Sequence, residues 1–165
     1  MSYLMDDRYL AQARLPSNSG SKSVQFRLRE VEVKSDDSIL LVEVAARGEM
    51  IERGKKKGGG FVTDFEWAFP QLRVSSKALS ELHASIRRAL DQFEPFAVSL
   101  GVGECVLSCE LSHGSDGGAR RGLSNFTIVC GVSVSQADCS FAVDPSCLLE
   151  FAEGLEHMSV FMHQA

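Results

Sequence analysis

Alternating hydrophobic and polar positions along this chain predict a protein built mainly of β-strands. Apolar residues recur at every second position in several stretches, and this spacing puts side chains on one face of a strand. The clearest stretch ends in Phe65, Trp67 and Phe69, with Glu66 and Ala68 between them. The strands predicted in this way span 24–33, 39–47, 61–69, 96–100, 105–111, 126–134 and 139–143.

Two other segments have the spacing of amphipathic helices. The first helix is predicted to begin at Ser75 or Ser76, because a serine side chain caps the free amides of a first turn. The second is predicted to begin at Asp144 and Pro145, a capping aspartate followed by a proline at the first helical position. The expected buried stripe of the first helix consists of Leu79, Leu82, Ile86, Leu90 and Phe93.

The order of three strands, a helix, four strands and a helix predicts an α+β fold. We expect a mostly antiparallel, curved sheet of about seven strands with two packed helices. The chain has 165 residues, which suits one domain, and we place that domain at 24–165. Residues 1–23 are predicted to be a flexible N-terminal tail, because the segment 15–21 is rich in turn-forming residues.

Composition narrows the classes of partner. The formal net charge is −5, which disfavours binding to nucleic acid, because phosphate contacts need a basic surface. No stretch reaches the roughly 20 apolar residues of a membrane span, so no membrane partner is expected. The first fifteen residues lack an uninterrupted apolar run, and we therefore expect a cytoplasmic protein. The five cysteines are expected to be reduced core thiols.

Catalytic and metal sites are not expected from the sequence. No two of the four histidines have the spacing of zinc ligands on one helical face, so we predict neither a metal nor a cofactor. His113 follows Cys109 by four residues, but Cys109 belongs to a predicted core row. The alternative that stays open is a small hydrolase that uses His113, or that uses Asp64 and Glu66 as acid and base.

Four carboxylates are candidates for binding a partner. Asp64 and Glu66 are two residues apart on a predicted strand, so they point to the same side, away from the aromatic row. Glu43 lies on a neighbouring strand, and Glu110 extends the set. These residues predict an acidic patch for a basic partner, since complementary charge accelerates association and sets specificity. An ordinary solvated sheet face is the alternative.

Three segments together carry a resemblance to a known family. They are the strand Asp37–Val44, the segment from Phe65–Phe69 to Leu79 and Leu82, and the strand-to-helix segment Phe141–Leu148. With these segments, 37–158 resembles the WapI-type family of bacterial immunity proteins. The resemblance implies a protein that binds and neutralises a cognate toxin domain, and we expect it to do so by occlusion, without chemistry. A monomer or weak homodimer is expected. A self-assembling structural module is a further hypothesis.

Overall fold

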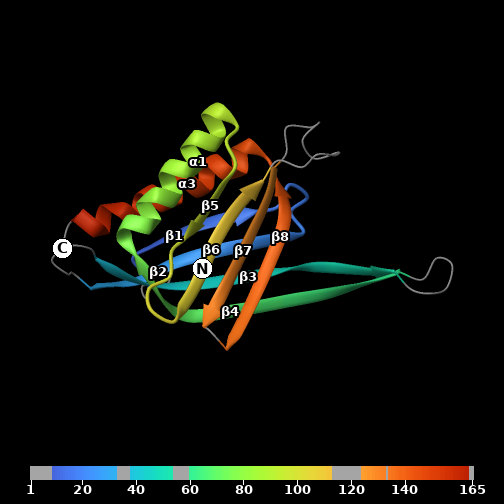
Figure 1. Ribbon diagram of the computed structural model, residues 1–165. Coiled ribbons are helices and arrows are strands. Elements are labelled where there is room, and N and C mark those ends of the chain that lie inside the picture. The colour runs from blue at the N-terminus through green and yellow to red at the C-terminus, as the bar shows by residue number, and fades with distance from the viewer. Residues whose placement is uncertain (1–8, 33–37, 54–59, 113–123, 133, 164–165) are drawn as a thin grey trace, which may run out of the picture.

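The computed structural model contains eight strands and two helices in the part of the chain that it describes (Figure 1). That part comprises residues 9–32, 38–53, 60–112, 124–132 and 134–163, and only the backbone is described for 49–53, 60–65 and 159–163. The strands are β1 (Ala11–Pro16), β2 (Lys22–Glu32), β3 (Ile39–Arg53), β4 (Gly60–Ser75), β5 (Phe96–Ser99), β6 (Cys105–Ser112), β7 (Ser124–Val132) and β8 (Ser135–Val143). The helices are α1 (Ser76–Gln92) and α3 (Pro145–His163).

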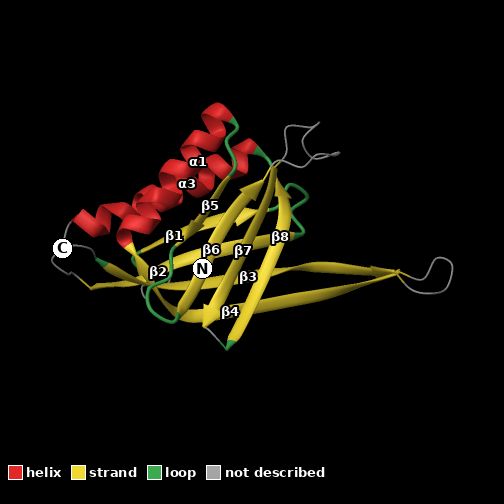
Figure 2. Ribbon diagram, viewed as in Figure 1, coloured by secondary structure: helices red, strands yellow, loops and turns green. Residues whose placement is uncertain are grey.

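The strands form two antiparallel sheets, and each sheet is a meander of consecutive strands (Figure 2). The first sheet has the order β1-β2-β3-β4, and the second has the order β5-β6-β7-β8. The predicted α+β class with antiparallel strands and two helices is therefore confirmed. Two sheets of four strands replace the single sheet of about seven, because alternation identifies a strand without identifying its neighbour.

The first strand lies inside the segment that the sequence analysis assigns to a flexible tail. β1 pairs with β2 along its whole length, and its residues Ala13 and Leu15 are 2% and 0% exposed. The structure thus differs from the predicted tail over 1–23, because the turn-forming residues after β1 connect a hairpin rather than forming a linker. Residues 1–8 lie outside the described residues.

One cluster of buried apolar side chains is shared by both sheets and both helices. Phe151 of α3 packs edge-on against Phe26 of β2, with the ring centroids 5.4 Å apart. The same ring packs against Phe126 of β7 at 6.1 Å. All three side chains are at most 1% exposed, and burying such a side chain stabilises a fold by about 1.5–3 kcal/mol. One helical residue therefore joins the two sheets.

Both helices begin at the caps that the sequence predicts. The Ser75 hydroxyl accepts a hydrogen bond from the amide of Ala78 at 3.2 Å, and Asp144 Oδ1 accepts one from the amide of Cys147 at 3.1 Å. The predicted burial of Phe93 is wrong: this residue is the C-cap of α1, has φ 56° and is 65% exposed. Its left-handed backbone ends the helix and turns the side chain outward.

The two helices lie side by side along one side of the sheets, as Figure 1 shows. α3 also packs closely on β1, where a Cβ atom at Gly154 would lie 2.7 Å from the Cα atom of Ala13. A glycine inside a helix is usually destabilising, so this close approach is the physical reason for its presence. No helix in the described ranges has the length and apolar character needed to cross a membrane.

β3 and β4 form a long hairpin that extends beyond the rest of the first sheet (Figure 1). β2 pairs with β3 as far as Gly48, and farther out the described parts of β3 and β4 pair only with each other. Inside the sheet, the register between β3 and β4 shifts between Val42 and Val44. Two residues of β4, Pro70 and Gln71, therefore lie opposite one residue of β3, an arrangement that bends the strand and changes where its side chains point.

Candidate functional site

The polar face of the first sheet is the candidate site, because it gathers charged side chains around a hollow. Strand alternation builds this face. Arg27 of β2 lies between the buried residues Phe26 and Leu28, and Glu43 of β3 lies between two buried valines. The apolar neighbours point into the core and the charged residues point outward. Four strands therefore contribute to one polar surface.

A hollow of about 410 Å³ opens in this face and is bordered by residues from all four strands. Its floor is low where two cross-strand neighbours, Ala45 and Ala68, carry only methyl groups. Longer side chains from the adjacent register positions stand around them. The charged residues that line the hollow are Arg14, Arg27, Glu43, Arg47 and Glu66.

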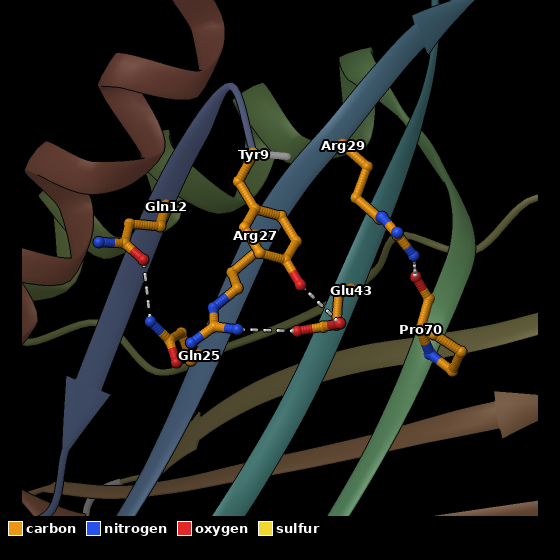
Figure 3. Close-up of polar contacts among 7 residues, drawn as sticks. All are labelled: Tyr9, Gln12, Gln25, Arg27, Arg29, Glu43 and Pro70. Carbon is orange, nitrogen blue, oxygen red and sulfur yellow. Dashed lines mark hydrogen bonds and ion pairs between the residues drawn. The ribbon is translucent and has the colours of Figure 1, made fainter. Parts of the chain in front are cut away.

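Glu43 is held by partners within the molecule (Figure 3). Its Oε1 atom accepts a hydrogen bond from Arg27 Nη1 at 3.2 Å, and its Oε2 atom accepts one from the Tyr9 hydroxyl at 3.0 Å. Only 16% of the Glu43 side chain is exposed. Both carboxylate oxygens are thus engaged, and the charge of Glu43 is compensated by the arginine beside it.

Tyr9 lies against two arginines of β2 on the same face. The ring centroid is 5.0 Å from Cζ of Arg27 and 5.8 Å from Cζ of Arg29, which is within the range of cation–π attraction. Arg29 Nη1 also donates to the carbonyl oxygen of Pro70 at 3.2 Å (Figure 3). This carbonyl belongs to the bulge of β4. Tyr9 and the bulge therefore hold these two guanidinium groups in fixed positions.

Arg14 and Arg47 are exposed, whereas Arg27 and Arg29 are partly buried. Within the described part of the chain, neither Arg14 nor Arg47 has a carboxylate within ion-pair distance. Glu66 lies directly opposite Arg47 in the register of β3 and β4, yet the two side chains form no ion pair. The hollow thus keeps two arginines whose hydrogen-bond donors face solvent. A guanidinium group with free donors is suited to bind a carboxylate or a phosphate.

The four predicted partner-binding carboxylates do not form one acidic patch in the described residues. Glu43 and Glu66 both line the hollow, but Glu43 is paired with Arg27. Glu110 lies in β6, in the second sheet, where it is exposed between two buried residues. The side chain of Asp64 lies outside the described residues. A role of these carboxylates in binding a partner stays a prediction.

Sequence reasoning missed the arginines of this face. One of them, Arg14, lies in the segment assigned to a tail. Arg27 and Arg29 alternate with the apolar row of a predicted strand, and this alternation was a signal that could have been followed to the outer face. The contact between Tyr9 and Glu43 joins residues 34 positions apart, so no local pattern marks it.

Two of the thiols, Cys109 and Cys130, are buried in the core. Burial raises the pKa of Cys109 far above its ordinary value, and burial together with the neighbouring Cys105 raises the pKa of Cys130 to about 12. The thiolate is the reactive form of cysteine, so both groups behave as core hydrophobes. His113, the proposed partner of Cys109, lies outside the described residues.

No metal centre is present among the described residues, where no three histidine, cysteine, aspartate or glutamate side chains lie close enough together to hold an ion. His83 of α1 is half-buried, and burial, followed by the nearby Arg87, lowers its pKa. This histidine belongs to the helices and not to the hollow. The hollow offers hydrogen-bond donors and charge through its arginines and glutamates. No protein-family model, curated protein or solved structure matches the chain.

Proposed function

We propose that this chain is an immunity-type protein that neutralises a toxin domain of another protein. It would do so by covering the active site or the substrate-binding surface of the toxin domain. The observation that carries the proposal is the hollow in the outer face of the first sheet. Its arginines are mounted on strands, which hold binding groups more firmly than loops do. The resemblance of 37–158 to the WapI-type family supports the class of partner.

The chemistry of this face suits a protein partner. Arginine and tyrosine are enriched among the residues that dominate protein–protein affinity, and the face combines Arg27, Arg29 and Tyr9 in one cluster. Stable complexes bury on the order of 1,600 Å² in total, or about 800 Å² from each partner. An interface of that size would cover the hollow and the strands around it, so the partner would be blocked by occlusion alone.

Co-expression with the product of the adjacent gene tests the proposal. We expect the two proteins to copurify and calorimetry to give a stoichiometric complex. Growth inhibition by the toxin domain should then be relieved only when this protein is at least equimolar. Absence of binding to that purified domain would refute the proposal.

The same experiment separates occlusion from the alternative of a small hydrolase. An enzyme that destroys a toxin or its product protects growth with much less than one enzyme molecule per toxin molecule. An occluding protein protects growth only when at least one molecule is present for each toxin molecule. Light scattering of the protein alone tests the alternative of a self-assembling module. We expect a monomer or a weak homodimer, and a large stable assembly would favour the module instead.

A further inference from the structure

We propose that the partner docks on the hollow through an acidic segment, with a carboxylate side chain entering between Arg14 and Arg47. The identity of the partner rests on the proposed function, whereas the chemistry of the surface is argued from the hollow itself. Among the charged residues that line the hollow, three arginines stand against two glutamates, although the chain as a whole has a net charge of −5.

The charges in the hollow are not equivalent. Arg27 and Glu43 compensate each other, and Tyr9 holds both of them in place. Arg14 and Arg47 are exposed, and Glu66 stands opposite Arg47 in the register. Glu49 and Asp64 are opposite each other two positions farther along β3 and β4, and their side chains lie outside the described residues. Apart from the Arg27–Glu43 pair, the residues that line the hollow therefore carry two arginines against one glutamate, and an incoming carboxylate meets attraction from two sides.

The geometry leaves room for such a side chain. Arg14 lies on β1 and Arg47 on β3, with β2 between them. Arg14 is in register with Gln25 and Ala45, so Arg47 is also offset by two residues along β3, and the two backbones are about 12 Å apart at ordinary strand spacing. Ser23 and Gln25 of β2 lie between the two arginines, and the floor is low beside these residues at Ala45 of β3. Two long guanidinium side chains reach across this spacing, so a carboxylate above Ser23 and Gln25 can accept hydrogen bonds from both.

A protein segment fits this site better than a nucleic acid does. Binding to a nucleic acid depends on many phosphate contacts, and the hollow offers two uncompensated arginines on a chain that is acidic overall. A glutamate or aspartate side chain needs only one such pair. Aromatic and arginine neighbours around the pair then provide the remaining contact area.

Titration of the isotopically labelled full chain with short synthetic peptides tests the surface chemistry by nuclear magnetic resonance. The probes are a peptide of alternating glutamate and serine, the matching lysine–serine peptide, and oligouridine. We expect the glutamate peptide to shift the resonances of residues around the hollow, and added salt to weaken its binding. Equal or tighter binding of the lysine peptide or of oligouridine at the hollow would overturn the proposal, as would no shifts with millimolar glutamate peptide.

Charge variants link the probe to the named arginines. Arg14→Glu should weaken the glutamate peptide about tenfold, because it replaces attraction by repulsion at an exposed position. Arg47→Gln is the second variant, chosen because a glutamate there would stand opposite Glu66 and disturb the strand pair. Lys77→Glu on α1 is the control with the same change in net charge as Arg14→Glu, and it should leave binding unchanged.

The purified toxin domain separates the two proposals. If that domain does not bind but the glutamate peptide binds at the hollow, the proposed function fails and the surface chemistry stands. If the domain binds wild-type protein, Arg14→Glu and Arg47→Gln equally well, the proposed function stands and the acidic docking segment is overturned.

Discussion

Gly154 allows a direct test of how closely α3 approaches the first sheet. A Cβ atom at this position would lie 2.7 Å from both Cα and Cβ of Ala13 and 2.9 Å from the carbonyl oxygen of Gln12. Ordinary contacts between carbon atoms are about 3.5–4.0 Å, so Gly154→Ala requires α3 and β1 to separate. Because the obstructing atoms include backbone, a change of side-chain rotamer does not relieve the clash.

The magnitude follows from two opposing effects. Helix propensity alone favours alanine over glycine by about 1 kcal/mol in a helix interior. Overpacking costs about 1–3 kcal/mol, and the upper part of that range applies because moving α3 also disturbs Phe151 and Leu155, which are buried in the core. We therefore expect Gly154→Ala to lower the free energy of unfolding by about 1–2 kcal/mol and Tm by about 3–6 °C.

Urea denaturation and calorimetry measure both quantities. Glu150→Ala, at an exposed position of the same helix, is the matched control and should change the free energy of unfolding by no more than about 0.5 kcal/mol. The double variant with Ala13→Gly should be less destabilised than the sum of its parts, since one of the two clashing carbon atoms is gone. A Gly154→Ala protein that is more stable than wild type would show that helix propensity wins and that the close approach is not real.

Three further predictions concern single side chains. Asp144→Ala should lower the free energy of unfolding by about 1 kcal/mol at neutral pH by removing the cap of α3. Hydrogen bonds from Ser146 and the Cys147 amide lower the pKa of Asp144 below 3.8, so the difference from wild type should shrink as the pH falls through the folded pKa in urea titrations. Burial lowers the pKa of His83 below 6.5, so as the pH falls this histidine takes up a proton in the unfolded chain before it does so in the folded protein. The free energy of unfolding of the wild type should therefore decrease below about pH 6.5, and His83→Leu should lack this decrease. Tyr9→Phe should cost about 1 kcal/mol in thermal unfolding by removing the hydrogen bond to Glu43, and no change would contradict the bond.

Local patterns were sufficient to predict most strands and both helix starts. The serine and aspartate caps act within three residues of their own positions, so the sequence alone contains their signal. The alternation that predicted Val24 to Val33 as a strand survives in β2, because one face of that strand is buried in the core. Sequence reasoning succeeded where a neighbour along the chain determines the structure.

Features that depend on distant segments were not predictable in this way. β1 is a strand because it pairs with β2 and packs under α3, and the turn-forming residues that follow it suggested a linker instead. In the sequence, Val132 and Val134 continue an apolar row, yet in the structure they are 41% and 92% exposed near the junction between β7 and β8. The pairing of Glu43 with Arg27 and Tyr9 depends on strand register, which alternation does not specify.

The packing of α3 on β1 brings the last described helix against the first described strand. Within each sheet every strand pairs with its neighbour in sequence, so each meander can form soon after it leaves the ribosome. The row of Ala13 and Leu15 remains without its helical cover until Gly154 has been synthesised. We expect the decisive cooperative step of folding to follow the synthesis of α3, when this helix docks and completes the core.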